Sequence, residues 1–221
     1  MSQPLLEAKG ISKSFSHPQK IEILAPFSLS VAKGESIAIT GRSGEGKSTL
    51  LHILGTLEPP DTGTIAIHGT LVSPSTAPFF RTHSLGFIFQ AFHLLEDFSA
   101  LDNVLMPSRI ARKRLDLDYG RSLLSQVGLL ERALFPAKLL SGGEKQRLAI
   151  ARALCNDPDL IFADELSGNL DAANALAVST LLFTLVRAKK KSLILVTHDP
   201  QLASLCDHQY TLANTHLTLH K

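Results

Sequence analysis

The sequence predicts an α/β fold with a mixed β-sheet core, an antiparallel β-subdomain and a helical insertion. Near-continuous apolar runs occur at residues 35–40, 159–164 and 192–197, as expected of strands that are buried on both faces of a sheet. Helical patterns separate these runs, and such alternation indicates a parallel sheet covered by helices. We therefore expect the three runs to be the central strands.

Two further regions complete the expected fold. Shorter β-rich runs at 5–15, 27–31 and 63–72 are bounded by Gly, Pro and Asp-Thr-Gly turns, which indicates antiparallel strands beside the main sheet. Residues 91–139 have helical patterns broken by prolines, and we expect a helical subdomain there. A chain of 221 residues with 44% hydrophobic residues fits a single domain spanning 1–221.

Composition narrows the possible partners and the compartment. A net charge of +2 is too weak a bias to indicate nucleic acid or an anionic membrane surface, and we expect no nucleic-acid partner. Cys155 and Cys206 form no Cys-x-x-Cys pattern, so neither a disulfide framework nor a zinc site is expected. No leader pattern or apolar run of about 18 residues is present. These features favour a cytosolic protein that is at most peripheral at a membrane.

The segment "GRSGEGKST" at residues 41–49 has the Gly-x4-Gly-Lys-Ser pattern of a phosphate-binding loop, between an apolar run and a helical pattern. Glycines let backbone N–H groups surround phosphate oxygens, and the following helix adds its positive N-terminal end. Lys47 is expected to reach the β- and γ-phosphates, and Ser48 to bind Mg²⁺ through its hydroxyl. The expected nucleotide contacts are Gly41, Arg42, Ser43, Gly44, Glu45, Gly46, Lys47, Ser48 and Thr49.

Glu45 is unusual inside such a loop. A carboxylate close to a triphosphate opposes binding by Coulomb repulsion unless it points to solvent or pairs with a cation. Arg42 is one candidate partner. The sequence therefore predicts that replacing Glu45 by serine leaves nucleotide affinity unchanged or tightens it.

The run "LIFADEL" ends in adjacent carboxylates, Asp164 and Glu165. Ligands of open α/β sheets sit at the carboxyl ends of the strands. We expect Asp164 to hold Mg²⁺ and Glu165 to polarise the water that attacks the γ-phosphate. A small-molecule kinase or a GTPase could use the same loop, but an Asn-Lys-x-Asp guanine motif is absent from the sequence. ATP hydrolysis is the simplest interpretation.

The segment "LSGGEKQRLAIARAL" opens with a hydroxyl and two glycines. Ser141 and Glu144 have the Ser-x-x-Glu spacing of a capping box, which would need only a helix start. Gly142 and Gly143 are poor helix formers, and capping gives no reason for them. Close approach of a phosphate to the helix N-terminus supplies a reason, and the two interpretations are compatible.

Together with "LIFADE", "SGNLD" (167–171) and "VTHD" (196–199), these motifs resemble those of ATP-binding subunits of ABC transporters over essentially the whole chain. The resemblance implies an ABC-type P-loop fold, an ATPase with ATP and Mg²⁺ as cofactors, and head-to-tail dimers. In that family, the Ser-Gly-Gly of one copy closes over the γ-phosphate held by the other. By resemblance, Ser141, Gly142 and Gly143 would contact ATP bound to a second copy of this chain.

The resemblance assigns four further residues. Gln90 matches the glutamine that senses Mg²⁺ and the attacking water, and His198 matches the histidine that contacts the γ-phosphate. Asp171 matches the aspartate that links the half-sites, although it would also serve as a helix N-cap. Phe15 lies where the family places an aromatic residue against adenine, and the alternative is a core phenylalanine of a strand.

The stretches at 84–107 and 50–65 resemble more specifically the LolD-type ATP-binding subunits of lipoprotein-releasing systems, which work at the cytoplasmic face of the bacterial inner membrane. By that resemblance, residues 91–107 would receive a coupling helix of a membrane permease; the alternative for their apolar side chains is packing within the insertion. Macrolide-exporter-type subunits, the cell-division-associated ATPase and soluble non-transport ABC ATPases remain alternatives. Leu166 and Ser167 replace the usual Pro-Thr after the carboxylates. Within residues 91–107, the apolar side chains that would contact the coupling helix are Phe92, Leu94, Leu95, Phe98 and Met106.

Overall fold

The computed structural model of the chain describes residues 3–16, 19, 21–166, 168 and 170–220. These fall into two compact units, one formed by residues 1–81 with 190–221 and the other by residues 82–189. Ser167 and Asn169, in the "SGNLD" segment, lie outside the described residues.

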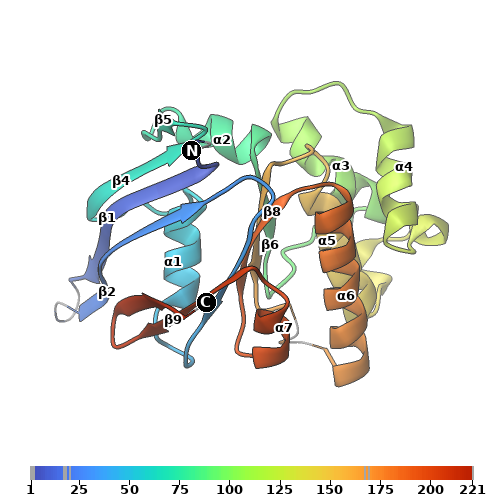
Figure 1. The fold of residues 1–221 in the computed structure, drawn as a ribbon. Helices are drawn as coiled ribbons and strands as arrows, with labels where there is room; N and C mark the ends of the chain where they lie inside the picture. The colour runs from blue at the N-terminus through green and yellow to red at the C-terminus, as the bar shows by residue number, and fades with distance from the viewer. Residues whose placement is uncertain (1–2, 17–18, 20, 167, 169, 221) are drawn as a thin grey trace. The chain divides into compact units, whose positions relative to one another are not determined.

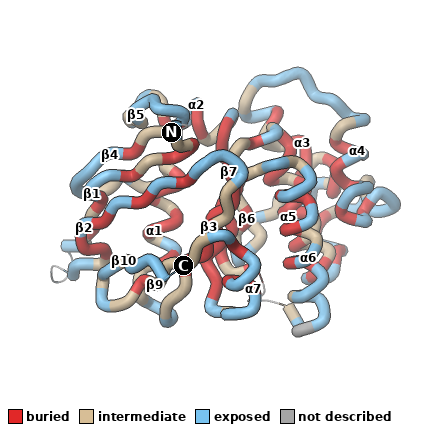
Figure 2. The backbone as a smooth tube through the Cα atoms, in the orientation of Figure 1, coloured by how far each residue is buried: buried red, intermediate tan, exposed pale blue. Residues whose placement is uncertain are grey.

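The first unit contains the expected antiparallel sheet, in the strand order β2-β1-β4-β5 (Figure 1). The strand β1 (Leu6–Phe15) pairs antiparallel with both β2 (Ile21–Val31) and β4 (Thr62–Ile67). A short strand, β5 (Thr70–Leu71), closes a hairpin with β4. Buried and accessible residues alternate over much of β2, as in a sheet that has one face towards a core (Figure 2).

The same unit holds a mixed sheet around β3 (Ser36–Thr40). This strand is parallel to β8 (Ser192–Val196) on one side and to β9 (His208–Ala213) on the other. The strand β10 (His216–Leu219) pairs antiparallel with β9. The helices α1 (Lys47–Leu54) and α7 (Pro200–Ser204) contact β8 and β3, respectively. The hairpin β9–β10 and the helix α2 (Ala77–His83) were not predicted from the sequence.

The second unit carries the parallel strands β6 (Leu85–Ile88) and β7 (Leu160–Asp164) and most of the helices. The helix α5 (Gly142–Ala153) contacts its neighbours α3, α4 and α6, and lies beside α6 in Figure 1. The expected helical region at 91–139 therefore contains α3 and α4, followed by two 3-10 turns. The bounds are Ala100–Ile110 for α3, Leu117–Gln126 for α4, Leu130–Arg132 and Ala137–Leu139 for the turns, and Ala172–Ala188 for α6.

Local sequence explains where these helices begin. The N-caps Ser99, Asp116, Ser141 and Asp171 each accept a hydrogen bond from the backbone N–H three residues further on. Each such cap satisfies one of the N–H groups that a helix start leaves without a partner, and contributes about 1 kcal/mol. The fold class predicted from the sequence is confirmed, including the mixed sheet, the antiparallel strands and the helical insertion.

The close packing of β6 against α5 gives a test of the second unit. A Cβ added at Gly86 would lie 2.6 Å from the carbonyl oxygen of Ala153 and 2.9 Å from Pro158 Cγ. We expect Gly86→Ala to lower the free energy of unfolding by about 2 kcal/mol, because β6 would have to move away from that backbone. Gly128→Ala is the control: it meets open space and should cost about 1 kcal/mol through its φ of +69°. Urea unfolding of both variants measures this, and equal losses would contradict the packing argument.

Candidate active site

The phosphate loop joins β3 to α1 through glycines whose backbone other residues rarely adopt. Gly41, Gly44 and Gly46 have φ values of +150°, +84° and +91°. A Cβ on Gly41 would collide with the carbonyl oxygen of Leu212, and one on Gly46 with the side chain of Ile23. One close approach comes from the backbone and the other from the half-buried side chain of Ile23, and both φ values are left-handed, so the loop shape favours glycine at these two positions.

The start of α1 is suited to an anion. Its N-cap is Gly46, which has no side chain to offer, and its first turn carries no acidic residue. The N–H groups of the first turn therefore keep their hydrogen-bonding capacity and the positive end of the helix dipole. Lys47 is largely buried, and its Nζ donates hydrogen bonds to the carbonyl oxygens of Gly41 (2.9 Å) and Arg42 (2.8 Å). This arrangement fits the phosphates of a nucleotide.

Glu45 folds back over the loop. Its Oε2 accepts a hydrogen bond of 2.7 Å from the backbone N–H of Arg42, and it lies 2.8 Å from the position of a Cβ on Gly41. Arg42, the candidate cation partner, contributes its backbone N–H and not its guanidinium; no ion pair between the two side chains occurs among the described residues. The carboxylate thus occupies a loop donor that an anionic ligand could otherwise use.

His198 belongs to the same unit as this loop. It follows β8, and the backbone N–H of Thr197 donates to the carbonyl oxygen of Ile39 at 3.1 Å. Because Ile39 stands two residues before Gly41, the carboxyl ends of β8 and β3 lie next to each other. His198 is exposed, as a contact to a bound phosphate requires. The structure therefore places His198 at the strand end that leads into the phosphate loop.

The second unit brings Gln90 together with the two carboxylates. Gln90 follows β6, Asp164 ends β7, and the two strands are parallel neighbours with Ile88 opposite Ala163. Asp164 is mostly buried, and Glu165 has a left-handed backbone with φ of +48°. A Cβ on Gly168 would lie 2.6 Å from Gln90 Nε2. A non-glycine residue at positive φ is strained, and such strain is common at catalytic positions.

Ser141 forms the expected capping box at the start of α5. Its hydroxyl accepts from the backbone N–H of Glu144, and the Glu144 carboxylate accepts from the backbone N–H of Ser141 at 2.8 Å. That hydrogen bond, with smaller effects from the Ser141 hydroxyl and Arg132, lowers the pKa of Glu144 below its ordinary value. The capping box is confirmed, and Ser141 and Gly142 remain exposed to solvent.

Asp171 is the N-cap of α6 and lies close to this helix start. Its carboxylate accepts from both the backbone N–H (3.0 Å) and the side-chain amide (2.6 Å) of Asn174. These two hydrogen bonds lower the pKa of Asp171. A Cβ on Gly143 would stand 3.1 Å from the Asn174 Oδ1 atom. Gly143 therefore has a packing reason to be glycine within its own chain, whereas Gly142 is exposed.

The remaining predicted residues are accessible. Phe15 ends β1 with 44% of its surface exposed, and Lys13 Nζ lies 5.7 Å from the centre of its ring. The alternative of a core phenylalanine is therefore wrong. In the segment 91–107, Leu95 and Phe98 are exposed to 40% and 45%. The other apolar residues named there are half-buried: Phe92, Leu94 and Met106.

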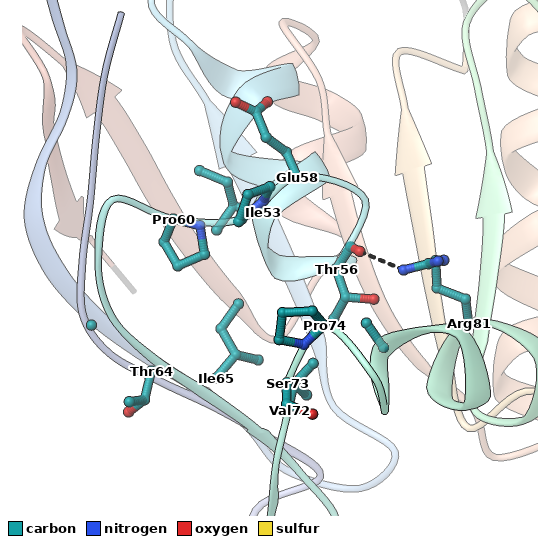
Figure 3. A pocket seen from close by; sticks show the side chains of 13 residues that line it. Ile53, Thr56, Glu58, Pro60, Thr64, Ile65, Val72, Ser73, Pro74 and Arg81 are labelled. Atoms are coloured by element: carbon teal, nitrogen blue, oxygen red, sulfur yellow. Dashed lines mark hydrogen bonds between the residues drawn. The ribbon is translucent and has the colours of Figure 1, made fainter.

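A separate cavity of about 420 Å³ lies at the C-terminal end of α1, whereas the phosphate loop lies at its N-terminal end. Figure 3 shows Arg81 reaching towards Thr56, and its Nη1 donates to the Thr56 carbonyl oxygen at 2.8 Å. Apolar side chains such as Ile53, Ile65 and Pro74 form much of the wall. No group of three or more His, Cys, Asp or Glu residues within the described part of the chain could hold a metal ion by itself.

Magnesium prefers oxygen ligands, and proteins usually bind it through one or two side chains together with substrate phosphates. The hydroxyl of Ser48 and the carboxylate of Asp164 are oxygen donors of this kind. Ser48 belongs to the first unit and Asp164 to the second, and the chemistry of each oxygen donor by itself fits Mg²⁺. In the part of the chain that is described, no helix is both long and apolar enough to cross a membrane.

Known proteins resemble this chain along nearly its whole length. The family model described as "ABC transporter" matches residues 24–168. The chain is 57% identical over 215 residues to the lipoprotein-releasing system ATP-binding protein LolD of Protochlamydia amoebophila, covering 95% of this chain and 94% of the relative. Identity to the protein of the same name from Treponema pallidum is 46% over 219 residues, with 96% of each covered.

A solved structure agrees with these relatives. The dimeric ATP-binding cassette MJ0796, in a post-hydrolysis state bound to ADP and Pi, superimposes with a TM-score of 0.89. Its sequence is 30% identical, and the superposition covers 98% of both chains. The likeness therefore extends over both compact units of the fold.

The position of Glu45 gives a test of the phosphate loop. We expect Glu45→Ser to bind nucleotide about five-fold more tightly, because about 1 kcal/mol of repulsion between the carboxylate and the phosphates disappears. Glu45→Gln is the matched control, since it keeps an acceptor for the Arg42 N–H and removes only the charge. Calorimetric titration with ATP measures both. A marked loss of affinity in the serine variant would show that the carboxylate supports binding.

The capping box gives a pH-dependent test. Because the folded pKa of Glu144 lies below its ordinary value of 4.5, the ionised carboxylate stabilises the fold fully above pH 4.5, and this stabilisation is lost as the pH falls through the folded pKa. We expect Glu144→Gln to lose about 0.5 kcal/mol at pH 7, allowing for solvent screening, and almost nothing below the folded pKa. Urea unfolding at pH 7 and at successively lower pH values measures this. Glu131→Gln, on an exposed turn outside the capping box, is the control variant.

Proposed function

The chain belongs to the ABC transporter family and is an ATPase, and from that premise we propose that it powers the release of lipoproteins from the inner membrane of a bacterium. In this proposal the chain works as one nucleotide-binding domain at the cytoplasmic face, attached to separate membrane permease subunits. The strongest support for lipoproteins as the cargo is the 57% identity to a LolD protein over 95% of this chain. The accessible apolar residues within 91–107 would form much of the permease contact.

Two copies of the chain would together form two ATP sites, and each site would contain residues of both copies. The phosphate loop, Asp164, Glu165, Gln90 and His198 of one copy would bind ATP from one side. The exposed Ser141 and Gly142 of the other copy, with Gly143 behind them, would close the site over the γ-phosphate. The dimeric state of MJ0796 supports this assembly.

The side chains named above divide the work of hydrolysis. Lys47 would exchange its two carbonyl contacts for phosphate oxygens, which carry more negative charge and bind a cation more strongly. Glu165 would accept a proton from the attacking water, and Gln90 and His198 would orient that water and the γ-phosphate. Bound Mg²⁺ would supply charge neutralisation on the phosphates. Phe15 would stack on the adenine, and Asp171 would link the two half-sites.

Reconstitution tests the proposed cargo. The chain and the permease subunits of its own organism are placed in proteoliposomes with a fluorescent acylated lipoprotein, and release to a soluble acceptor is followed with and without ATP. We expect release that depends on ATP and on both components. ATP hydrolysis without lipoprotein release would refute this cargo and leave the ATPase assignment standing, as an exporter-type or cell-division-type role would predict.

Glu165 gives the test of the catalytic assignment. We expect Glu165→Gln to keep its ATP affinity within about two-fold, to form a dimer stabilised by ATP, and to lose about 100-fold or more in turnover, because the amide cannot accept the proton. Size-exclusion chromatography with light scattering measures the dimer, and phosphate release measures turnover. Glu131→Gln is the control and should behave as the unmodified chain. A Glu165→Gln variant that stays monomeric in saturating ATP and Mg²⁺ would refute the mechanism.

A further inference from the structure

The loop that follows Gln90 has an uncommon backbone. Phe92 and His93 are consecutive non-glycine residues with left-handed φ values of +58° and +47°. Each residue in this conformation costs about 1–2 kcal/mol, so the surrounding structure must hold it in place.

Arg152, in the last turn of α5, supplies one such contact. Its Nη1 donates to the carbonyl oxygen of His93 and its Nη2 to the carbonyl oxygen of Phe92, each at 2.5 Å. Because the two residues are consecutive and both left-handed, their carbonyl groups can be met by one planar guanidinium, whose donors form a rigid fork. Burial lowers the pKa of the Arg152 guanidinium, yet arginine remains charged at neutral pH.

A row of aromatic and histidine rings connects the same loop to strand β7, which ends at Asp164. Phe162, two residues before Asp164, stacks on Phe87 with ring centres 5.3 Å apart, and Phe87 stacks on Phe89 at 5.7 Å. Phe89 meets His93 edge to face at 5.2 Å. Movement of the loop backbone at His93 would therefore disturb packing that reaches β7.

The other end of the loop is held independently. Asn103 on α3 is fully buried, accepts from the Leu95 N–H at 2.8 Å and donates to the Leu95 and Ser99 carbonyl oxygens at 3.0 Å. The amide of Asn103 thus fixes the part of the loop that presents Leu95 and Phe98. Loss of the Arg152 contact would leave this second attachment in place, so the loop would shift locally while the helices stay packed.

Helix α5 thereby joins two functional regions. Its first residues follow Ser141, which the proposed function places at the ATP of a second copy, and its last turn carries Arg152. The 12 residues of α5 span about 18 Å. A rigid rod of this length would transmit a displacement of its N-terminus to the loop at its C-terminus, because packed elements move as bodies.

We propose that Arg152 is a positioning residue that ties the loop after Gln90 to helix α5, so that engagement of Ser141 by a second copy's nucleotide sets the position of Gln90. The proposal rests on the proposed function for the role of Gln90. Arg152 would act by holding the Phe92 and His93 carbonyl groups and would not itself contact nucleotide or water.

The test uses Arg152→Lys and Arg152→Gln in the full chain. Lysine keeps the charge but can donate to the two carbonyl groups only as a flexible point charge, and glutamine loses the charge as well. We expect kcat for ATP hydrolysis to fall about 10-fold in the glutamine variant and less in the lysine variant, with KM within two-fold of the unmodified chain. KM should stay nearly unchanged because the phosphate loop belongs to the first compact unit, whereas Arg152 and the loop that it holds belong to the second. Arg121→Gln, which removes an exposed arginine of α4 paired with Asp118, is the control and should change neither constant.

Hydrogen exchange gives a readout that does not depend on activity. The backbone amides of Phe92 and His93 should exchange at least 10-fold faster in Arg152→Gln, while the Leu95 amide, held by Asn103, and the amides of α3 and α5 keep their protection. If the loop amides and kcat of Arg152→Gln both match those of Arg121→Gln, the proposal is overturned. General loss of protection across α3 and α5 would also overturn it, since Arg152 would then be a folding residue. If the unmodified chain hydrolyses no ATP, the proposed function fails, and exchange still decides whether Arg152 holds the loop.

Discussion

The site depends on one constraint, namely that the backbone N–H groups at the start of α1 stay available to an anion. The N-cap Gly46 offers no side chain, and its left-handed backbone brings the chain past Ile23 at a distance that only glycine allows. The lysine that follows is held against loop carbonyl groups, which keeps its charge beside the donors. Glu45 then competes for one donor of the same loop. Nucleotide affinity is the balance between these contacts and the phosphates that would replace them.

Sequence predicted those parts of the fold that depend on short-range patterns. The strand–loop–helix around residues 41–49, the buried strands ending at Thr40, Asp164 and Val196, and the Ser141 capping box each follow from local residue types. The hairpin β9–β10 was missed because its strands are only partly buried and have little apolar pattern. The turn between them, at Asn214 and Thr215, has two left-handed residues without glycine, so the usual signal was absent.

Contacts that depend on the folded backbone could not be predicted from the sequence. By charge, Arg42 is one candidate partner for Glu45, but the loop geometry directs the carboxylate to the backbone N–H of Arg42. Arg152 carries no motif of its own, and the one sequence signal is a charged residue between buried alanines in "AIARAL". Its partners, the carbonyl groups of Phe92 and His93, lie 59 and 60 residues away and depend on two left-handed residues. Residue type does not encode such a backbone, so neither contact could be read from the sequence.

The two glycines after Ser141 differ in their surroundings, and the difference bears on the proposed dimer. Gly143 is buried, and a Cβ there would press on Asn174, so packing within the chain explains it. Gly142 is exposed and is the first residue of α5, directly after the N-cap Ser141. In the proposed dimer a nucleotide held on the other copy would approach this helix start, and a side chain at Gly142 would stand between the α5 N-terminus and the phosphate.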